Sequence, residues 1–162
     1  MWRHQNRRGG RLMGKRYSVE IERTGRASRE VAFELLRDAE AWSRWAGPAI
    51  PKSRWDGGPL RDDMAVGRVR VVGTARFNTA EQITVDEPPM THGYRILADW
   101  PVRDYSARVV LTEGADGALT VRWSGQFEER IPGSGLLWRA FLRRFLGRLA
   151  ENLLAYASKQ AP

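Results

Sequence analysis

Three side chains in this sequence of 162 residues could carry acid–base chemistry. Glu81, Tyr94 and Tyr105 fall on the apolar faces of three predicted strands. A carboxylate in such a place can remove an acidic proton, and a phenol can donate a proton or orient a substrate. A simpler role is also open to each residue, because Glu81 begins its strand and could reach solvent, and both tyrosines could be core residues whose hydroxyls reach an edge.

Residue types exclude most other site chemistry. Cysteine is absent, so disulfides, thiolate nucleophiles and cysteine metal sites cannot form. The sequence has two histidines, His4 and His92, which excludes a histidine-rich metal site. His92 follows a Pro-Pro turn and is expected at the surface, with an inward position as the alternative. We therefore predict neither a metal nor a cofactor.

The net charge of +8 is concentrated at the N-terminus. Residues 1–16 hold six of the 27 basic residues and none of the 19 acidic ones, which leaves 21 basic against 19 acidic residues in the rest. Three glycines and no periodicity predict a disordered basic tail over 1–16, and translation could begin at Met1 or Met13. No run is apolar enough for a membrane span or a secretory signal, so we expect a cytoplasmic protein.

The remaining residues, 17–160, are predicted to form one α+β domain. Apolar residues recur at strand spacing near the start and at helical spacing near the end. Phe145 is expected to anchor the last helix, within the row Leu137, Phe141, Phe145, Leu149 and Leu153. The elements expected outside the central part are a strand over 17–24, a helix over 29–38 capped by Ser28, a short helix with Trp42 and Trp45, and a long C-terminal helix over 134–157.

The central part has the pattern of antiparallel strands separated by turn residues. The clearest strand covers 119–128, where every second residue is apolar, as in a sheet with one wet face. Further runs lie near 66–77, 81–86, 91–99 and 103–112.

The parity of the apolar residues assigns an inward face to each of these strands. Small residues on that face, Gly73, Ala75, Ala98, Ala107 and Gly125, would leave a cavity beneath the sheet. Alternatively, they only admit large helix side chains or let the sheet bend. The same face includes Val69, Val71, Phe77, Ile83 and Val85. The same parity places the arginines of these strands on the outer face of the sheet: Arg68, Arg70, Arg76, Arg108 and Arg122.

The order of strand, two short helices, antiparallel strands and long helix resembles the START-like helix-grip (SRPBCC) superfamily. Residues 17–158 resemble its bacterial polyketide cyclase/dehydrase and lipid-transport group in several stretches. These are Ser28-Arg-Glu-Val-Ala-Phe-Glu-Leu-Leu-Arg-Asp before Trp42-x-x-Trp45, Glu81-Gln-Ile-Thr-Val-Asp-Glu-Pro-Pro before the Tyr94 strand, Trp123, and Arg130-Ile-Pro-Gly-Ser-Gly before the last helix. The resemblance implies a curved antiparallel sheet wrapped around the long helix with a cavity between them, but no single activity.

Sequence and resemblance together predict a protein that binds or transports a small hydrophobic ligand, such as a lipid or a polyketide-like compound. The alternative is a polyketide aromatase/cyclase, with Glu81 as base and Tyr94 or Tyr105 as acid. Such cyclases tend to place arginine beside these groups, and the outward parity of the strand arginines argues against this alternative. The predicted ligand-binding residues are Gly73, Phe77, Ala98, Ala107, Trp123, Gly125, Phe141 and Phe145.

A third class is a module that binds other macromolecules through the basic tail and the arginine-rich face of the last helix. A solvated helix face explains these arginines more simply. The interleaving of aromatic and basic residues seen in RNA-binding proteins is missing, so neither DNA nor RNA is expected as a partner. A monomer and a homodimer both fit the sequence.

Overall fold

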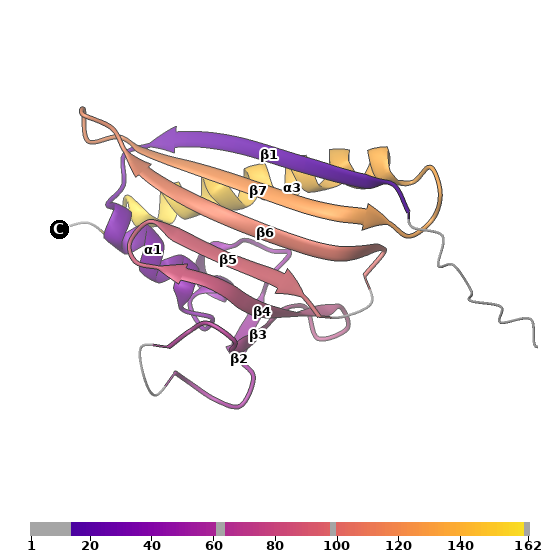
Figure 1. Cartoon of the computed structure of the whole chain (residues 1–162). Helices are drawn as coiled ribbons and strands as arrows, with labels where there is room; N and C mark the ends of the chain where they lie inside the picture. The colour runs from indigo at the N-terminus through magenta and orange to yellow at the C-terminus, as the bar shows by residue number, and fades with distance from the viewer. Residues whose placement is uncertain (1–13, 61–63, 98–99, 161–162) are drawn as a thin grey trace, which may run out of the picture.

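The structure, a computed structural model, describes residues 14–60, 64–97 and 100–160. Seven strands form one antiparallel sheet in the order β1-β7-β6-β5-β4-β3-β2. The long helix α3 lies along one face of this sheet, and α1 covers one end of the same face (Figure 1). The predicted α+β helix-grip fold is thereby confirmed, whereas most of the predicted basic tail lies outside the described residues.

The element bounds agree with the predicted ranges, except that the short strand β2 was not predicted separately and β3 covers only five residues of the predicted run 66–77. The elements are β1 (Arg16–Gly25), α1 (Arg29–Arg37), α2 (Trp42–Trp45), β2 (Lys52–Trp55), β3 (Val69–Gly73), β4 (Asn78–Glu87), β5 (Thr91–Ile96), β6 (Val102–Glu113), β7 (Leu119–Glu129) and α3 (Gly135–Ala157). None of the helices in the described part of the chain is long and apolar enough to cross a membrane.

Two tryptophans fasten α2 to the end of α1. Ser28 caps α1 as predicted, because its Oγ accepts a hydrogen bond from the backbone N–H of Val31 at 3.3 Å. At the other end of α1, Trp42 Nε1 donates to the Leu36 carbonyl at 2.8 Å and Trp45 Nε1 donates to the Leu35 carbonyl at 3.0 Å. These carbonyls belong to the last turn, where helix carbonyls lack partners within the helix.

The core lies between the sheet and the C-terminal half of α3. There Leu149, Leu153 and Ala157 are buried, together with Trp123 of β7 and Leu36 of α1. The predicted row along α3 is wrong for its N-terminal half. Phe145 is only half-buried, because the buried row shifts to Leu142 and Leu146.

The predicted inward face is wrong on β3. Arg70 pairs across the strands with Glu81 and therefore shares its face, so Arg70 and Val72 point inward and Val69 and Val71 point outward. The predicted run 66–77 is not one strand, because β3 ends at Gly73, whose φ of +132° breaks the alternation.

The predicted face is also wrong at the end of β4, where the register shifts between Ile83 and Val85. A β-bulge reverses the parity of the residues beyond it. Asp86 consequently lies on the inner face with its cross-strand partner His92, and Val85 does not.

Candidate functional site

A cavity of about 660 Å³ lies between the sheet and the N-terminal half of α3. Its volume is within the range typical of small-molecule sites. Strands β3 to β6 form one wall, and α2, the segment after it and α3 form the other. The side chains that line it are mostly apolar or aromatic: Trp42, Ile50, Val72, Ile96, Trp100, Trp138, Phe141, Leu142, Phe145 and Leu149.

Glu81, Tyr94 and Tyr105 come together on the sheet wall of this cavity. The ring centroids of the two tyrosines are 6.4 Å apart. Tyr105 reaches the wall from the irregular start of β6, where Asp104 has a φ of +49° and the register with β7 shifts. The structure thus gathers the three residues that the sequence marked for acid–base chemistry.

Burial raises the pKa of all three residues, Glu81, Tyr94 and Tyr105. Loss of solvent raises the pKa of Glu81, and the nearby Arg70 guanidinium offsets this only in part. Burial also raises the pKa of Tyr94 well above its usual value, helped by Tyr105 and the Glu81 carboxylate. The pKa of Tyr105 is raised as well, first by burial and then by Glu81. Both phenols therefore stay protonated and can donate hydrogen bonds.

The predicted ligand-binding residues divide into two sets. Gly73, Phe77, Phe141 and Phe145 line the cavity, with Phe77 at its mouth and 82% exposed rather than turned inward as predicted. Ala107, Trp123 and Gly125 are buried but do not line the cavity. Ala98 lies outside the described residues.

Tyr105 explains why Gly125 is not part of the cavity. A Cβ added to Gly125 would lie 3.2 Å from the Tyr105 hydroxyl and 3.3 Å from Val19 Cγ1. Gly125 therefore makes room for a large side chain and leaves no cavity, as in the alternative to the cavity prediction, but with a different source. That side chain comes from the sheet itself, not from the helix.

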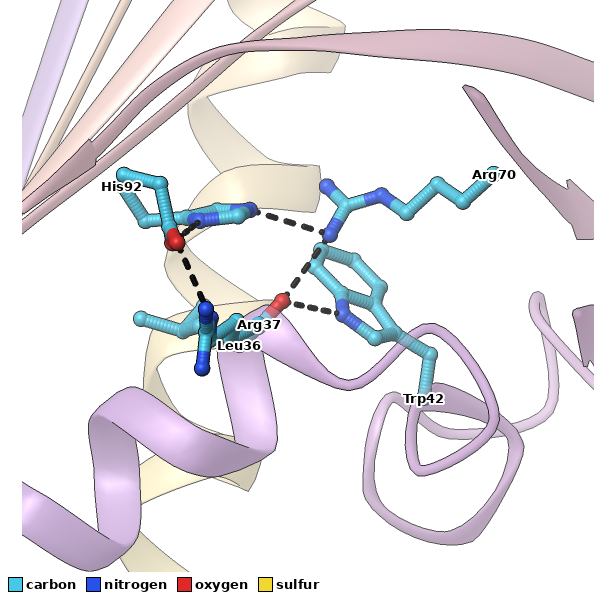
Figure 2. A network of polar contacts seen from close by, with 6 residues as sticks. Leu36, Arg37, Trp42, Arg70 and His92 are labelled. Atoms are coloured by element: carbon cyan, nitrogen blue, oxygen red, sulfur yellow. Dashed lines mark hydrogen bonds and ion pairs between the residues drawn. The ribbon is translucent and has the colours of Figure 1, made fainter. Parts of the chain in front are cut away.

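Arg70 is fully buried against the Glu81 side of the cavity, contrary to the prediction that it faces outward. Its Nε donates to Glu81 Oε2 at 2.8 Å, and its Nη1 donates to the Leu36 carbonyl at 2.9 Å. The guanidinium lies 4.0 Å from the ring centroid of Trp42 and 4.8 Å from that of Tyr94. Figure 2 shows Arg70 and Trp42 donating to the same Leu36 carbonyl oxygen.

His92 is also fully buried, so its predicted place at the surface is wrong. Its Nε2 lies 3.3 Å from Arg70 Nη1, and its Nδ1 lies 3.4 Å from Asp86 Oδ1 (Figure 2). A guanidinium can only donate, so Nε2 must accept and Nδ1 must carry the proton. Burial lowers the pKa of His92 to about 4, against the opposing effect of the Asp86 hydrogen bond, so the ring is neutral at pH 7.

The polar contacts form a chain from α1 to the cavity. Arg37 Nε donates to Asp86 Oδ2 at 2.9 Å, and the chain continues through His92 and Arg70 to Glu81. Each side chain limits the rotation of the next, so Glu81 is held in one orientation at the cavity wall. The described residues contain no group of three or more His, Asp or Glu side chains placed to hold a metal ion.

Sequence reasoning missed Arg70, Asp86 and Arg37 as parts of the site, and it preferred the surface over the inner face for His92. One signal for Arg70 was available, because Glu81 was placed inward and its cross-strand partner must share its face. The partner itself depends on the β3–β4 register, which the sequence pattern does not fix. Nothing in the sequence pattern indicates the bulge that brings Asp86 to His92.

Comparisons with known proteins agree with this fold. The family model described as polyketide cyclase/dehydrase and lipid transport matches residues 16–157. The fold is similar to that of a START superfamily protein from Mycobacterium smegmatis, with a TM-score of 0.69 and 14% sequence identity. That alignment covers 89% of this chain and 99% of the other. No curated protein matches the sequence.

Proposed function

Because the chain belongs to the polyketide cyclase/dehydrase and lipid-transport family, we propose that its cavity binds and carries a small, largely apolar ligand. One observation carries this proposal: a cavity of about 660 Å³ has mostly apolar walls, and Glu81, Tyr94 and Tyr105 lie together on its sheet wall. Its other polar lining residues, Arg76, Asn78 and Thr79, come from the β3–β4 turn and the start of β4. Sites for small molecules combine an apolar surface with a few polar groups that fix orientation.

The wall chemistry suggests how such a ligand lies. Its apolar body would contact Phe141, Phe145 and Trp138 on α3 and Val72 on β3. A hydroxyl or another hydrogen-bond donor of the ligand would be accepted by the Glu81 carboxylate, and the tyrosine hydroxyls would donate to a ligand oxygen. Gly73 and Phe77 would meet the part of the ligand nearest the mouth.

A titration with the neutral apolar probe N-phenyl-1-naphthylamine tests ligand binding. We expect saturable enhancement of its fluorescence by the native protein. The variant Ile96→Trp fills space beside Glu81, because Ile96 lines the cavity and pairs with Glu81 across the strands. It should weaken probe binding at least about tenfold, the factor that corresponds to 1.4 kcal/mol.

The matched control is Leu97→Trp on the next residue. Leu97 is exposed and does not line the cavity, so this variant adds the same indole outside it. The binding proposal would be contradicted if the native protein gave no saturable enhancement of probe fluorescence. It would also be contradicted if both variants weakened probe binding equally. Native mass spectrometry of freshly purified protein, before and after organic extraction, would show whether an apolar compound is retained.

The buried position of Arg70 favours a second candidate, a polyketide aromatase/cyclase. The expected outward position of the strand arginines had argued against this function, and Arg70 instead pairs with Glu81 behind the cavity wall. Glu81, with its raised pKa, would take the proton from a carbon between two carbonyls, and Tyr94 or Tyr105 would donate to the carbonyl oxygen that becomes the hydroxyl.

Exchange of hydrogen for deuterium at the central carbon of a small β-diketone tests this candidate. The native protein should accelerate the exchange, followed by proton NMR, and Glu81→Gln should abolish the acceleration because an amide is not a base. Probe binding should survive in Glu81→Gln, which separates loss of chemistry from loss of the cavity. If the native protein exchanges the hydrogen no faster than Glu81→Gln does, the cyclase candidate is contradicted and ligand binding is the one remaining candidate function.

A further inference from the structure

Exposed apolar side chains gather at the end of the molecule where the cavity opens. Antiparallel connections bring the β3–β4 turn, the β5–β6 loop, the β7–α3 loop and the start of α3 to this one end, the right side of Figure 1. We call it the mouth end, because Arg76, Phe77, Pro101 and Phe141 there line the cavity. The apolar side chains exposed there are Phe77 (82%), Leu137 (71%), Ile131 (65%) and Leu136 (59%).

The mouth end is also cationic. Arg76 and Arg139 are exposed and pair with no carboxylate among the described residues, and Arg130, Lys15 and Arg16 are exposed beside them. The carboxylates of Glu128 and Glu129 at this end are buried and hold local backbone N–H groups. Within the described part of the chain, Asp104 is the exposed carboxylate of this end.

The opposite end of the sheet carries exposed carboxylates instead. Glu34 of α1, Glu87 of β4 and Asp116 of the β6–β7 turn are exposed there and form no ion pair among the described residues. Glu30 and Glu113 are exposed as well and share Arg29, and the exposed cations of this end are fewer than its carboxylates. The molecule is therefore electrically asymmetric along the strands. In the field of a negatively charged surface, it would turn its mouth end toward that surface.

The N-terminal segment is attached to the described domain at the mouth end. The N–H of Gly14 donates to Glu128 Oε1 at 2.7 Å, so the preceding residues join the domain at the mouth end. Those residues include Arg3, Arg7, Arg8 and Arg11 and no acid.

We propose that the mouth end docks on a membrane surface that contains anionic lipids. Phe77, Ile131, Leu136 and Leu137 would enter the boundary between headgroups and acyl chains, and Arg76 and Arg139 would contact lipid phosphates. Apolar side chains ringed by arginines are the chemistry of interfacial membrane binding. Trp100 and Trp138, half-buried at the same place, suit the headgroup level. Nucleic acid would match the charge but would leave the exposed apolar side chains without a partner.

This docking goes beyond ligand binding and does not depend on it. The cavity would open toward the lipid while the protein is docked, so an apolar ligand could enter or leave without crossing water.

Vesicle sedimentation tests the docking with the full-length chain free of ligand. We expect binding to vesicles of phosphatidylcholine with phosphatidylglycerol, much weaker binding to phosphatidylcholine alone, and a loss of binding as salt is added. The double variant Arg76→Glu/Arg139→Glu should bind the anionic vesicles at least about tenfold more weakly. Phe77→Ser/Leu137→Ser should weaken binding by about the same factor, because less apolar surface enters the lipid.

Matched controls separate a docking site from general charge. Arg26→Glu/Arg108→Glu makes the same change in net charge at exposed residues away from the mouth end, and Val66→Ser/Met90→Ser removes exposed apolar groups elsewhere. Both controls should bind as the native chain does. Equal binding to both kinds of vesicle, or equal losses in the mouth-end and control variants, would overturn the proposal. Titration of N-phenyl-1-naphthylamine without vesicles reports on the cavity separately.

Discussion

The two halves of α3 face the same sheet with apolar side chains of similar size, yet they lie in different surroundings. In the C-terminal half, Leu153 and Ala157 are buried against the sheet and α1. In the N-terminal half, Leu137 and Phe141 are exposed, and Phe145 borders the cavity. The C-terminal half of the helix therefore packs throughout, whereas the N-terminal half buries Leu142 and Leu146 on one side and borders the cavity on the other.

The difference arises from what else fills the layer between helix and sheet. At the packed end, α1 and α2 insert Phe33, Leu36 and Trp42, and Trp42 packs edge-on against Trp123 at a ring distance of 6.1 Å. At the open end the described residues insert no further helix, and the side chains of α3 alone do not reach across. The Arg70–Glu81 pair lies between the two regions, with Arg70 buried and Glu81 on the cavity wall.

The largest effect is expected from Arg70→Met, at the border of the two regions. The change leaves the buried Glu81 carboxylate without its cation and removes a donor from the Leu36 carbonyl and from His92. Breaking a buried ion pair on one side typically costs about 3–5 kcal/mol of unfolding free energy. Chemical denaturation measures this loss.

Two companion variants show whether pairing is the cause. Arg108→Met, at an exposed residue of β6, should change the unfolding free energy by less than about 0.5 kcal/mol. Arg70→Met/Glu81→Leu should recover part of the loss, because no unpaired charge remains. A double variant less stable than Arg70→Met would contradict this account of the loss.

A pair of leucine variants tests the comparison itself. Leu153→Ala, in the packed half of α3, should reduce the unfolding free energy by about 3 kcal/mol, through lost burial and the void that remains. Leu137→Ala, in the exposed half, should reduce it by less than about 0.5 kcal/mol. Similar losses in thermal or chemical unfolding would mean that the two halves are packed alike.

Regular elements were predictable from the sequence because their periodicity is uninterrupted. The alternation over 119–128 gave β7 and its inward face, and Ser28 together with the apolar spacing gave α1. The gathering of Glu81, Tyr94 and Tyr105 also followed from strand parity, since each precedes or follows an apolar residue by two positions.

The rest depended on local breaks that a pattern does not show. A positive φ at Gly73 and the bulge after Ile83 each reverse a face, and these two reversals account for the inward positions of Arg70 and Asp86. His92 needs no such break, because it shares the inner face of β5 with Tyr94 two residues later. Val69–Gly73 has apolar residues on both faces, so the pattern allowed either parity and the inward assignment of Val69 and Val71 was wrong. Whether Gly125 faced a cavity or a side chain depended on the position of Tyr105.

Acid should weaken the buried network through His92. The unfolded state takes up a proton as the pH falls through about 6.5, whereas folded His92 does so only near its pKa of about 4. The stability that neutral His92 contributes is therefore complete above pH 6.5 and is lost between about 6.5 and 4. From pH 7 to pH 4.5 this loss amounts to about 2 kcal/mol.

His92→Gln isolates that contribution, because glutamine does not titrate and can still accept from Arg70. Glu81 has a raised pKa and acts in the opposite sense, so its contribution grows as the pH falls, but both proteins share it. Denaturation at the two pH values should therefore give a difference that is about 2 kcal/mol smaller in His92→Gln. An unchanged difference would show that His92 does not govern the acid sensitivity.

A smaller effect than that of His92 is expected from Phe145→Ala, in the half of α3 that borders the cavity. A regular apolar row would make Phe145 a central anchor worth about 3–5 kcal/mol. In the structure it is only half-buried, stacks on Phe141 at a ring distance of 5.9 Å, and already adjoins empty space. Its removal should therefore cost only about 1 kcal/mol of unfolding free energy, since little packed surface is lost. Leu146→Ala, one residue later and fully buried, should cost about 3 kcal/mol. The reverse order of the two losses would place the packed surface of α3 on its Phe145 side and close the cavity.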